Sequence, residues 1–310
     1  MDSDIGAREL VTVASDGLCL QGTHHRTHDR ISDARPGCGE NTRLGVLFLN
    51  SGYGPRAWGG DLAVDWADWF ARRGYPSFRF DLPGLGDSDG DLPVTVCEFI
   101  LLVNSGYYTS FVCDIAKDLT ERHNLSGVIL VGHCAGTVSA VYAAAASKHV
   151  KGLVALNPYF FQREPERAEI RKNISLLATR NRLTRQLSDV YRRVKKTRQL
   201  LRANRFPENA NLPLLRCWNR LISAGVPLLV LQTRGPRSPV GEFDYLGYLQ
   251  KSSGSEARLT VQYVDGANHS YADDVGRAAV RQHTGQWLNG GVASAGRDRI
   301  AFSEQLTVNS

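Results

Sequence analysis

Long apolar runs, paired cysteines and a basic leader are all missing from this sequence of 310 residues. No apolar run approaches the roughly 18 residues of a membrane span, so no membrane partner is expected. The six cysteines include no C-x-x-C pair, which argues against a zinc site and against a disulfide scaffold. The first ten residues begin acidic and lack the basic and then apolar pattern of a signal peptide. We therefore expect a cytoplasmic protein without a metal or other cofactor.

The composition is that of an ordinary globular protein, with 42% hydrophobic and 22% charged residues. A chain of this length can bury a large core, and it suits one elaborated α/β domain better than two independent ones. The formal net charge of +6 comes from one segment, because residues 163–205 carry fourteen Lys or Arg against four Asp or Glu. The local net charge of +10 exceeds the total, so the rest of the chain is net negative.

Strand-like and helix-like segments alternate along most of the chain. Residues 10–14 and 18–24 show the alternation of a β-hairpin, and residues 44–49 form a continuous apolar run, as in a strand buried on both faces. Later strand patterns followed by helical patterns predict a mainly parallel sheet with right-handed crossovers. The remaining expected strands are residues 75–80, 127–131, 150–156, 226–231 and 259–264, and the expected helices are residues 61–73, 111–123, 137–147 and 275–288.

The most informative motif is Gly132-His133-Cys134-Ala135-Gly136, which follows an apolar run. A nucleophile spaced between two glycines in this way is typical of a nucleophile elbow, where a strand turns directly into a helix. The turn strains the middle residue, and side chains larger than glycine two positions away would collide. Cys134 would stand exposed at the helix N-terminus, where unpaired N–H groups and the helix dipole favour a thiolate.

With this motif, its order of elements and two further segments, the chain resembles the α/β-hydrolase superfamily. The further segments are Arg79-Phe-Asp-Leu-Pro-Gly-Leu-Gly-Asp-Ser88 and Gly266-Ala-Asn-His269, and the resemblance covers residues 8–289. It implies a mainly parallel, eight-stranded sheet flanked by helices, with a helical cap inserted after the sixth strand. Within the superfamily the chain is most similar to bacterial hydrolases that accompany exopolysaccharide and secondary-metabolite gene clusters, some of which also carry Cys at the elbow.

The resemblance divides the chain into a core of residues 1–157 and 223–289, a basic helical cap of residues 158–222 and a tail of residues 290–310. Within the cap, apolar residues recur every three or four positions, which predicts two amphipathic helices. Their apolar face would cover the elbow and form an acyl pocket. The segment 81–90, with three aspartates and three glycines, is expected to be a structural turn.

A cysteine nucleophile needs a base, and His269 is the best placed of the eight histidines. It follows the last strand, where this fold brings a loop over the elbow. The third member of the catalytic triad is left open, because residues 232–241 contain no acid where many relatives carry an aspartate. Asp244 or Glu242 could reach His269 from a displaced loop. Alternatively, Asn157 could orient the imidazole through its carbonyl, as in the Cys-His-Asn sites of papain-like enzymes. The remaining alternative is a Cys-His dyad.

Two backbone N–H groups are expected to form the oxyanion hole. One is the N–H of Ala135, directly after the nucleophile, and the other belongs to Gly52 or Ser51 in the turn after the third strand. The side chain of His133 should point away from that of the nucleophile, which makes His133 a structural or pocket-lining residue.

The outer face of the cap is rich in arginine and lysine, including Arg192, Arg193, Lys195 and Lys196. Unless they only form a solvated surface, these residues are expected to contact an anionic partner. Such a partner would be an acyl carrier protein or the phosphates of coenzyme A or a pantetheine arm. Nucleic-acid binding is not expected, because no stacking aromatics are interleaved with the charges.

A cysteine in place of serine favours acyl transfer, because its attack on an ester, lactone or thioester leaves an activated thioester on the enzyme. We therefore expect a thioesterase, acyltransferase or cyclase that holds an acyl group on Cys134 and takes it from a carrier-bound thioester in a biosynthetic pathway. One alternative is an ester or lactone hydrolase resembling dienelactone hydrolase. Another is a non-catalytic or lyase-like relative that binds a ligand in the cap pocket.

Overall fold

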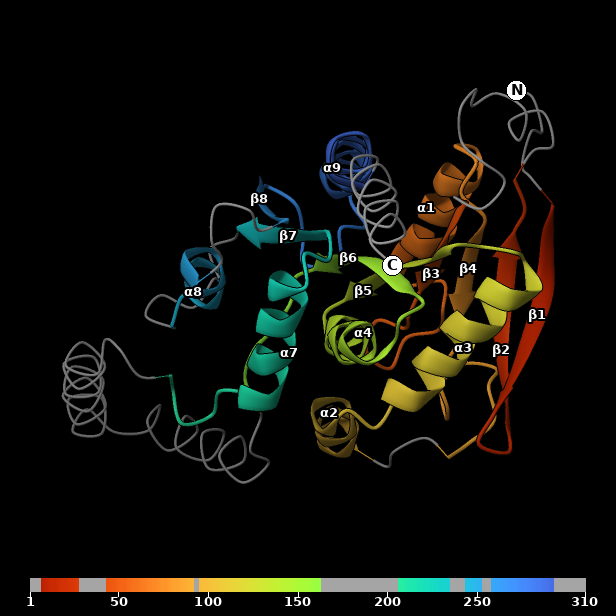
Figure 1. The fold of residues 1–310 in the computed structure, drawn as a ribbon, viewed down its shortest axis with the longest axis horizontal. Coiled ribbons are helices and arrows are strands. Elements are labelled where there is room, and N and C mark those ends of the chain that lie inside the picture. Colours follow the sequence, from red (N-terminus) through yellow and green to blue (C-terminus); the bar gives the residue numbers. More distant parts are fainter. Residues whose placement is uncertain are drawn as a thin grey trace, which may run out of the picture.

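An eight-stranded sheet runs through the centre of the molecule, with strand order β1-β2-β4-β3-β5-β6-β7-β8 (Figure 1). The computed structural model describes residues 7–27, 43–91, 95–162, 206–234, 243–252 and 258–292. β1 and β2 form an antiparallel hairpin, β2 pairs antiparallel with β4, and all other pairs are parallel. The strands are β1 (Arg8–Ser15), β2 (Leu18–His25), β3 (Leu44–Phe48), β4 (Ser77–Phe80), β5 (Gly127–His133), β6 (Val150–Leu156), β7 (Leu228–Arg234) and β8 (Leu259–Asp265).

Helices cover both faces of the sheet (Figure 1). α1 and α9 pack on one face, and α3, α4 and α7 pack on the other, so that the protein has a hydrophobic core on each side. The described helices are η2 (Gly59–Asp61), α1 (Leu62–Ala71), α2 (Val96–Ser105), α3 (Thr109–Arg122), α4 (Ala135–Ala146), α7 (Leu212–Ser223), α8 (Tyr245–Ser252), α9 (Asp274–Trp287) and η3 (Leu288–Val292).

The central strands read as continuous apolar runs because their side chains alternate between these two cores. In β3, Val46 and Phe48 enter the core beneath α1 and α9, whereas Leu47 enters the core beneath α3 and α4. All seven residues of β5 are buried. The expected eight-stranded, mainly parallel sheet is therefore confirmed, including the hairpin and the position of the elbow after the fifth strand.

Two helices, α2 and α8, were not expected from the sequence. A third helix, α7, lies inside the range that was assigned to the cap. α2 begins at a capping box in which Thr95 and Glu98 bond to each other's backbone N–H groups. α8 follows a segment that was expected only to supply a catalytic acid. α7 packs against α4 and buries Trp218 in the core. The structure thus attaches this part of the chain to the sheet.

The two ends of the basic segment lie side by side. Phe161 forms a β-bridge with Ala210, and the N–H of Gln162 donates to Asn209 O over 2.7 Å. The described residues that flank the basic segment therefore meet at one place on the domain. Residues 163–205 themselves lie outside the described residues, so the two amphipathic cap helices stay a prediction.

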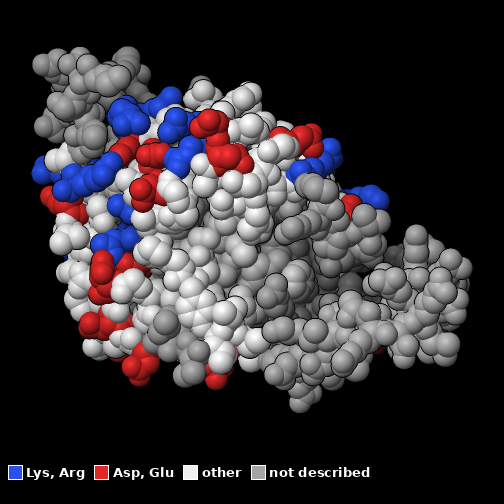
Figure 2. Space-filling view, turned by 180° about the vertical axis from the view of Figure 1, so that it is seen from behind, with Lys and Arg blue, Asp and Glu red and all other residues white. Residues whose placement is uncertain are grey.

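The described surface mixes charges of both signs. On the face shown in Figure 2, Lys and Arg side chains are interspersed with Asp and Glu instead of forming a patch of one sign. Among the described residues no single helix is long and apolar enough to cross a membrane, although α2 and α3 pass that test together as a pair bent by 65°.

A buried polar network attaches the β1–β2 hairpin to α1 and β4. Nδ1 of His25 lies 2.5 Å from Asp68 Oδ1, and Nε of Arg79 donates to His25 Nε2 over 2.8 Å. Because a guanidinium can only donate, Nε2 must accept, and the His25 proton is on Nδ1. Burial lowers the pKa of His25 to about 4, which keeps the imidazole neutral at pH 7.

Candidate active site

Cys134 lies at the sharp turn between β5 and α4. Its φ of 52° is in the left-handed region, a conformation that costs a non-glycine residue on the order of 1–3 kcal/mol. The backbone N–H of Cys134 donates to Leu156 O over 2.9 Å, which ties the turn to the end of β6. Cys134 is half-buried at this turn.

The two glycines of the motif are required by close backbone approaches. A Cβ at Gly132 would lie 2.6 Å from Gly136 O, and a Cβ at Gly136 would lie 2.2 Å from Asn50 O. Both distances are too short for real Cβ contacts, so the expected collision two positions either side of Cys134 is confirmed. Gly136 also brings the start of α4 against the loop that follows β3.

The loop after β3 is held by the side chain of Asn50. Its Oδ1 accepts from the N–H of Leu82 over 2.7 Å, and its Nδ2 donates to Gly54 O over 3.0 Å and to Asp81 Oδ1 over 2.7 Å. The carbonyl oxygen and the NH₂ group of this buried amide are thus hydrogen-bonded, either to the turn after β4 or within the loop itself. These bonds attach the loop to the turn that follows β4.

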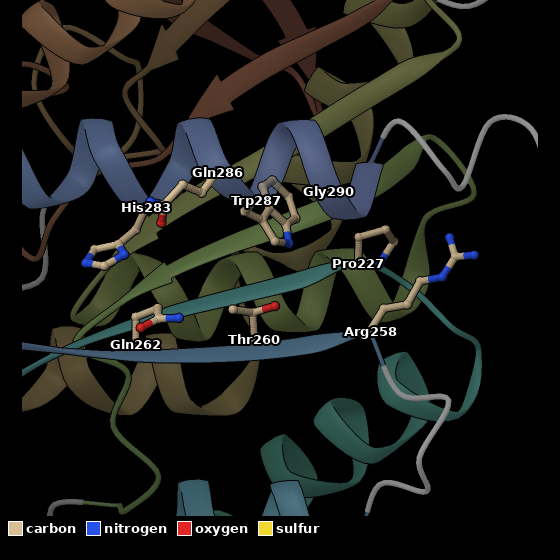
Figure 3. A pocket seen from close by; sticks show the side chains of 8 residues that line it. All are labelled: Pro227, Arg258, Thr260, Gln262, His283, Gln286, Trp287 and Gly290. Carbon is tan, nitrogen blue, oxygen red and sulfur yellow. The ribbon is translucent and has the colours of Figure 1, made fainter.

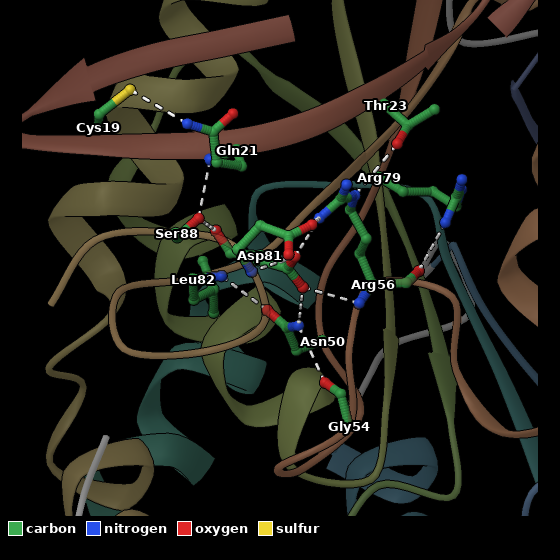
Figure 4. Close-up of polar contacts among 11 residues, drawn as sticks. Cys19, Gln21, Thr23, Asn50, Gly54, Arg56, Arg79, Asp81, Leu82 and Ser88 are labelled. Carbon is green, nitrogen blue, oxygen red and sulfur yellow. Dashed lines mark hydrogen bonds and ion pairs between the residues drawn. The ribbon is translucent and has the colours of Figure 1, made fainter. Parts of the chain in front are cut away.

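Asp81 is the centre of the polar contacts around this loop (Figure 4). Its carboxylate is fully buried, forms an ion pair with Arg56, and accepts from the backbone N–H groups of Arg56 and Asp87 over 2.7 Å and 3.2 Å. Gly86 is needed beside it, because a Cβ there would overlap the carboxylate. The segment 81–90 is therefore a structural turn, as expected, and it supports the loop of residues 50–56.

The expected oxyanion-hole residues lie on the elements that this arrangement brings together. Ala135 is the first residue of α4, so the helix itself does not use its N–H. Gly52 has a φ of 65°, and the hydroxyl of Ser51 lies 2.5 Å from His133 Nδ1. No described contact selects between Ser51 and Gly52 as the second donor, and both stay predictions.

His133 is 4% exposed and has a partner at each ring nitrogen. Nε2 lies 2.8 Å from His269 O, and because a carbonyl can only accept, Nε2 carries the proton. Burial lowers the pKa of His133 to about 4, so Nδ1 is unprotonated at pH 7 and accepts from the Ser51 hydroxyl. The side chain is thus a defined neutral tautomer.

His269 lies in the loop between β8 and α9, beyond the carboxyl end of the parallel strands. Its backbone carbonyl accepts from His133 Nε2 and from Asn157 Nδ2, which anchors it to the ends of β5 and β6. Partial burial lowers the pKa of its imidazole, so the ring is mainly neutral at pH 7 and able to accept a proton.

Asn157 contacts His269 differently from the sequence-based expectation. Its Oδ1 accepts from the N–H and the hydroxyl of Thr233 over 2.8 Å and 3.1 Å, and from Tyr271 Oη over 3.4 Å. With its carbonyl engaged in this way, the Asn157 side chain donates to the main chain of His269 over 2.7 Å and does not orient the imidazole. Asn157 itself is buried and has a φ of 46°.

The acidic candidates are not brought to His269 by the described contacts. Asp244 is exposed, and its Oδ1 accepts from the N–H of Gly247 over 2.8 Å at the start of α8. Among the described residues, no carboxylate is hydrogen-bonded to the His269 imidazole. Glu242 lies outside the described residues, as do the four cap residues expected to contact a carrier or phosphate, namely Arg192, Arg193, Lys195 and Lys196.

A pocket of about 390 Å³ lies between β8 and α9, away from the elbow (Figure 3). Its wall includes Pro227 and Arg258, which precede β7 and β8, whereas Cys134, Asn157 and His269 follow the carboxyl ends of their strands. In parallel sheets the ligand site is at the carboxyl ends. We therefore build the candidate site at the elbow and not in this pocket.

The free energy of unfolding should fall as the pH is lowered from 7 to 5. The pKa values of His25 and His133 rise from about 4 in the folded protein to 6.5 in the unfolded chain, so the unfolded state binds more protons between these values. Stability is therefore present above pH 6.5 and is lost on acidification, by about 2 kcal/mol for each imidazole between pH 7 and pH 5. Urea unfolding at the two pH values measures the difference. Equal midpoints would show that these imidazoles are not held neutral.

The sequence carried a signal for His133 that the motif alone did not reveal. It is the one strongly polar side chain in the otherwise apolar strand β5. A polar group in such a strand must find hydrogen-bond partners when it is buried, so a buried position predicts contacts on both ring nitrogens. Which residues those partners are depends on loops far away in the chain.

Comparison with known proteins identifies the family and the fold. The model of the α/β hydrolase fold family matches residues 46–251, and no curated protein matches the sequence. The esterase Pf2001 of Pyrococcus furiosus has a TM-score of 0.61 at 13% identity, with 93% of this chain and 94% of that chain covered. The α/β hydrolase GrgF of Penicillium sp. sh18 has a TM-score of 0.55 at 18% identity, with 93% and 99% covered. DcsB, solved with its substrate analogue, has a TM-score of 0.54 at 18% identity, with 93% and 100% covered. At these identities the likeness concerns the fold.

Proposed function

The chain belongs to the α/β hydrolase family, and we propose that it is an acyl-releasing or acyl-transferring enzyme with Cys134 as its nucleophile. One observation carries the proposal, namely that a cysteine occupies the left-handed turn between β5 and α4, with glycine required on either side. A thiol at this turn faces the N-terminus of α4, whose dipole favours negative charge. The family places a catalytic nucleophile at such an elbow.

The proposed reaction begins with transfer of the Cys134 proton to the neutral imidazole of His269. The thiolate attacks the acyl carbonyl, and the oxyanion accepts from the N–H of Ala135 and from that of Ser51 or Gly52. Collapse of the intermediate breaks the bond to the leaving alcohol or thiol, which takes the proton from His269. Water or another acceptor then gives a proton to His269 and attacks the thioester. Cys134 leaves as a thiolate and takes this proton back from His269.

We build the proposed site on Cys134 and His269, because no carboxylate among the described residues is hydrogen-bonded to the His269 imidazole. Asn157 supports the proposed Cys-His pair by fixing the main chain of His269. A thiolate and an imidazolium stabilise each other, so a third charged group is needed less than in a serine enzyme. Asp244 and Glu242 stay as acidic candidates for a third member.

A thioester donor is favoured over an oxygen ester by the choice of nucleophile. Exchange between two thioesters is nearly balanced, so the acyl group can be held on Cys134 until an acceptor arrives. Hydrolysis of an ester or lactone is the second candidate, supported by the likeness in fold to the esterase of Pyrococcus furiosus. The two functions differ in the preferred donor and in the fate of the acyl group.

The test compares a pantetheine thioester with an oxygen ester of the same acyl group, each with and without an added amine or alcohol. The proposal predicts faster release from the thioester and formation of the transferred product when an acceptor is present. Cys134→Ala, prepared in parallel, controls for uncatalysed release. Faster turnover of the oxygen ester, with the acid as sole product, would favour the hydrolase instead.

We further propose that the basic segment of residues 163–205 attracts an acyl carrier protein. The segment has a net charge of +10 in 43 residues, and the described residues that flank it meet at the Phe161–Ala210 bridge. Positive charge concentrated in this way raises the association rate with an acidic partner.

Reversing four of these charges should weaken the binding of the carrier-borne substrate but not that of a small thioester. In the variant with Arg192→Glu, Arg193→Glu, Lys195→Glu and Lys196→Glu, we expect KM for an acyl carrier protein thioester to rise by roughly tenfold or more at low ionic strength. Turnover of the small pantetheine thioester serves as the matched control and should stay near the wild-type value. An equal change for both substrates would argue against a carrier-binding role.

A further inference from the structure

We propose that His133 is a positioning residue that joins the loop of the oxyanion hole to the loop of the catalytic base. The role rests on the proposed function, since Ser51 and His269 matter together only if the site handles an acyl group. His133 itself contacts neither the substrate nor the reacting thiol in this account. It acts through the two residues that it holds.

The two loops follow strands that lie on opposite sides of β5 in the sheet. Ser51 follows β3, a neighbour of β5, whereas His269 follows β8, the edge strand that is separated from β5 by β6 and β7. The imidazole of His133, at the carboxyl end of β5, spans the gap between them. Its Nδ1 lies 2.5 Å from Ser51 Oγ and its Nε2 lies 2.8 Å from His269 O.

The ring of His133 is held in place by aromatic neighbours. Its centroid lies 5.7 Å from that of Trp58 and 6.3 Å from that of Tyr271. Trp58 is fixed in turn, because its Nε1–H donates to Leu49 O over 2.7 Å. A ring packed in this way keeps its acceptor toward Ser51 and its donor toward His269. Each loop is therefore positioned relative to the same side chain.

Neither contact can be replaced by water without loss, because His133 is 4% exposed. Removing a partner from a buried polar group costs the desolvation of the group that remains. His269 O would keep Asn157 Nδ2 as its second donor, so that loop would loosen but stay attached. The loop of Ser51 is also held by Asn50 and Asp81, so loss of the Nδ1 contact should free the Ser51 hydroxyl and leave the rest of the loop in place.

Two substitutions separate the contacts. In His133→Gln the amide nitrogen can take the place of Nε2 and keep the bond to His269 O, but the acceptor for Ser51 is lost. In His133→Asn the amide oxygen can take the place of Nδ1 and keep the bond from Ser51, but the donor to His269 is lost. His149→Gln is the control, because His149 precedes the amino end of β6 and the site lies at the carboxyl ends of the strands.

The readouts are kcat and KM for the pantetheine thioester and the pH profile of Cys134 alkylation by iodoacetamide. Alkylation reports the thiolate and its pairing with His269, and it requires no turnover. We expect His133→Gln to lower kcat on the order of 10- to 100-fold with KM and the alkylation profile unchanged, because the oxyanion hole acts mainly in the transition state. His133→Asn should instead shift the alkylation profile and lower kcat with it.

Ser51→Ala provides a second route to the same contact, because it removes only the hydroxyl. It should reproduce the kcat loss of His133→Gln, and the double variant should lose no more than either single one. Additive losses, or equal effects of Gln and Asn on both readouts, would overturn the proposal and leave His133 with a general structural role. If the wild type turns over no donor, the proposed function fails, while a shifted alkylation profile in His133→Asn still supports the tie to His269.

Discussion

The Cys134→Ala variant is expected to lose turnover by roughly 10⁴-fold or more, the loss typical of removing a nucleophile from an enzyme. The methyl group fits the elbow without strain beyond that of Cys134 itself, so the fold should survive. Rates are measured with the pantetheine thioester and the matched oxygen ester, and circular dichroism checks the fold. Equal activity in the wild type and in Cys134→Ala would show that the nucleophile lies elsewhere.

The conservative variant Cys134→Ser distinguishes a thiolate mechanism from simple positioning. Its hydroxyl ionises far less readily than a thiol, and no described carboxylate supports His269 in taking the proton. We therefore expect a slow hydrolase that loses transfer to amines more than it loses hydrolysis. A serine variant as fast as the wild type on all donors would argue that sulfur has no special role.

The second large effect is expected at Asp81, where the change acts on stability. Asp81→Ala leaves the Arg56 guanidinium with only the exposed carboxylate of Asp87 as an ion-pair partner, and it removes one of the two acceptors of the Asn50 amide. Breaking a buried ion pair by removing one partner typically costs about 3–5 kcal/mol. We expect the free energy of unfolding, measured with urea, to fall by this amount.

Asp87 offers a matched control, because it pairs with the same Arg56 nitrogen at the surface. Its side chain is 71% exposed, whereas that of Asp81 is 0% exposed. Exposed ion pairs contribute about 0–1 kcal/mol, so Asp87→Ala should change the stability little. Equal losses in the two variants would contradict the argument that burial makes Asp81 important.

The sheet and the elbow could be predicted because their causes are local. A short apolar run such as residues 44–49 predicts a strand in the interior of a sheet. The two glycines spaced around Cys134 predict the sharp turn of an elbow. The mainly parallel sheet of eight strands followed from the alternation of strands with helices and from the resemblance to a known superfamily. The structure confirms both this sheet and the collisions that the glycines avoid.

The missed elements depended on contacts that are distant in sequence or on weak local signals. α2 begins at Val96, directly after the N-cap Thr95, whose capping box with Glu98 is readable from the sequence but is not followed by a clear apolar period. The role of Asn157 was inferred as a contact to the imidazole, whereas Thr233 and Tyr271 engage its carbonyl. No local pattern could have shown that these side chains meet.

The most direct test of a Cys134 acyl-enzyme is the mass of the intact protein after brief mixing with an acyl-pantetheine and quenching in acid, followed by peptide mapping. The account predicts a mass increase of one acyl group, located on the peptide that contains Cys134 and absent from Cys134→Ala. An adduct that persists undiminished in Cys134→Ala, or turnover of the donor without any adduct in the wild type, would contradict it.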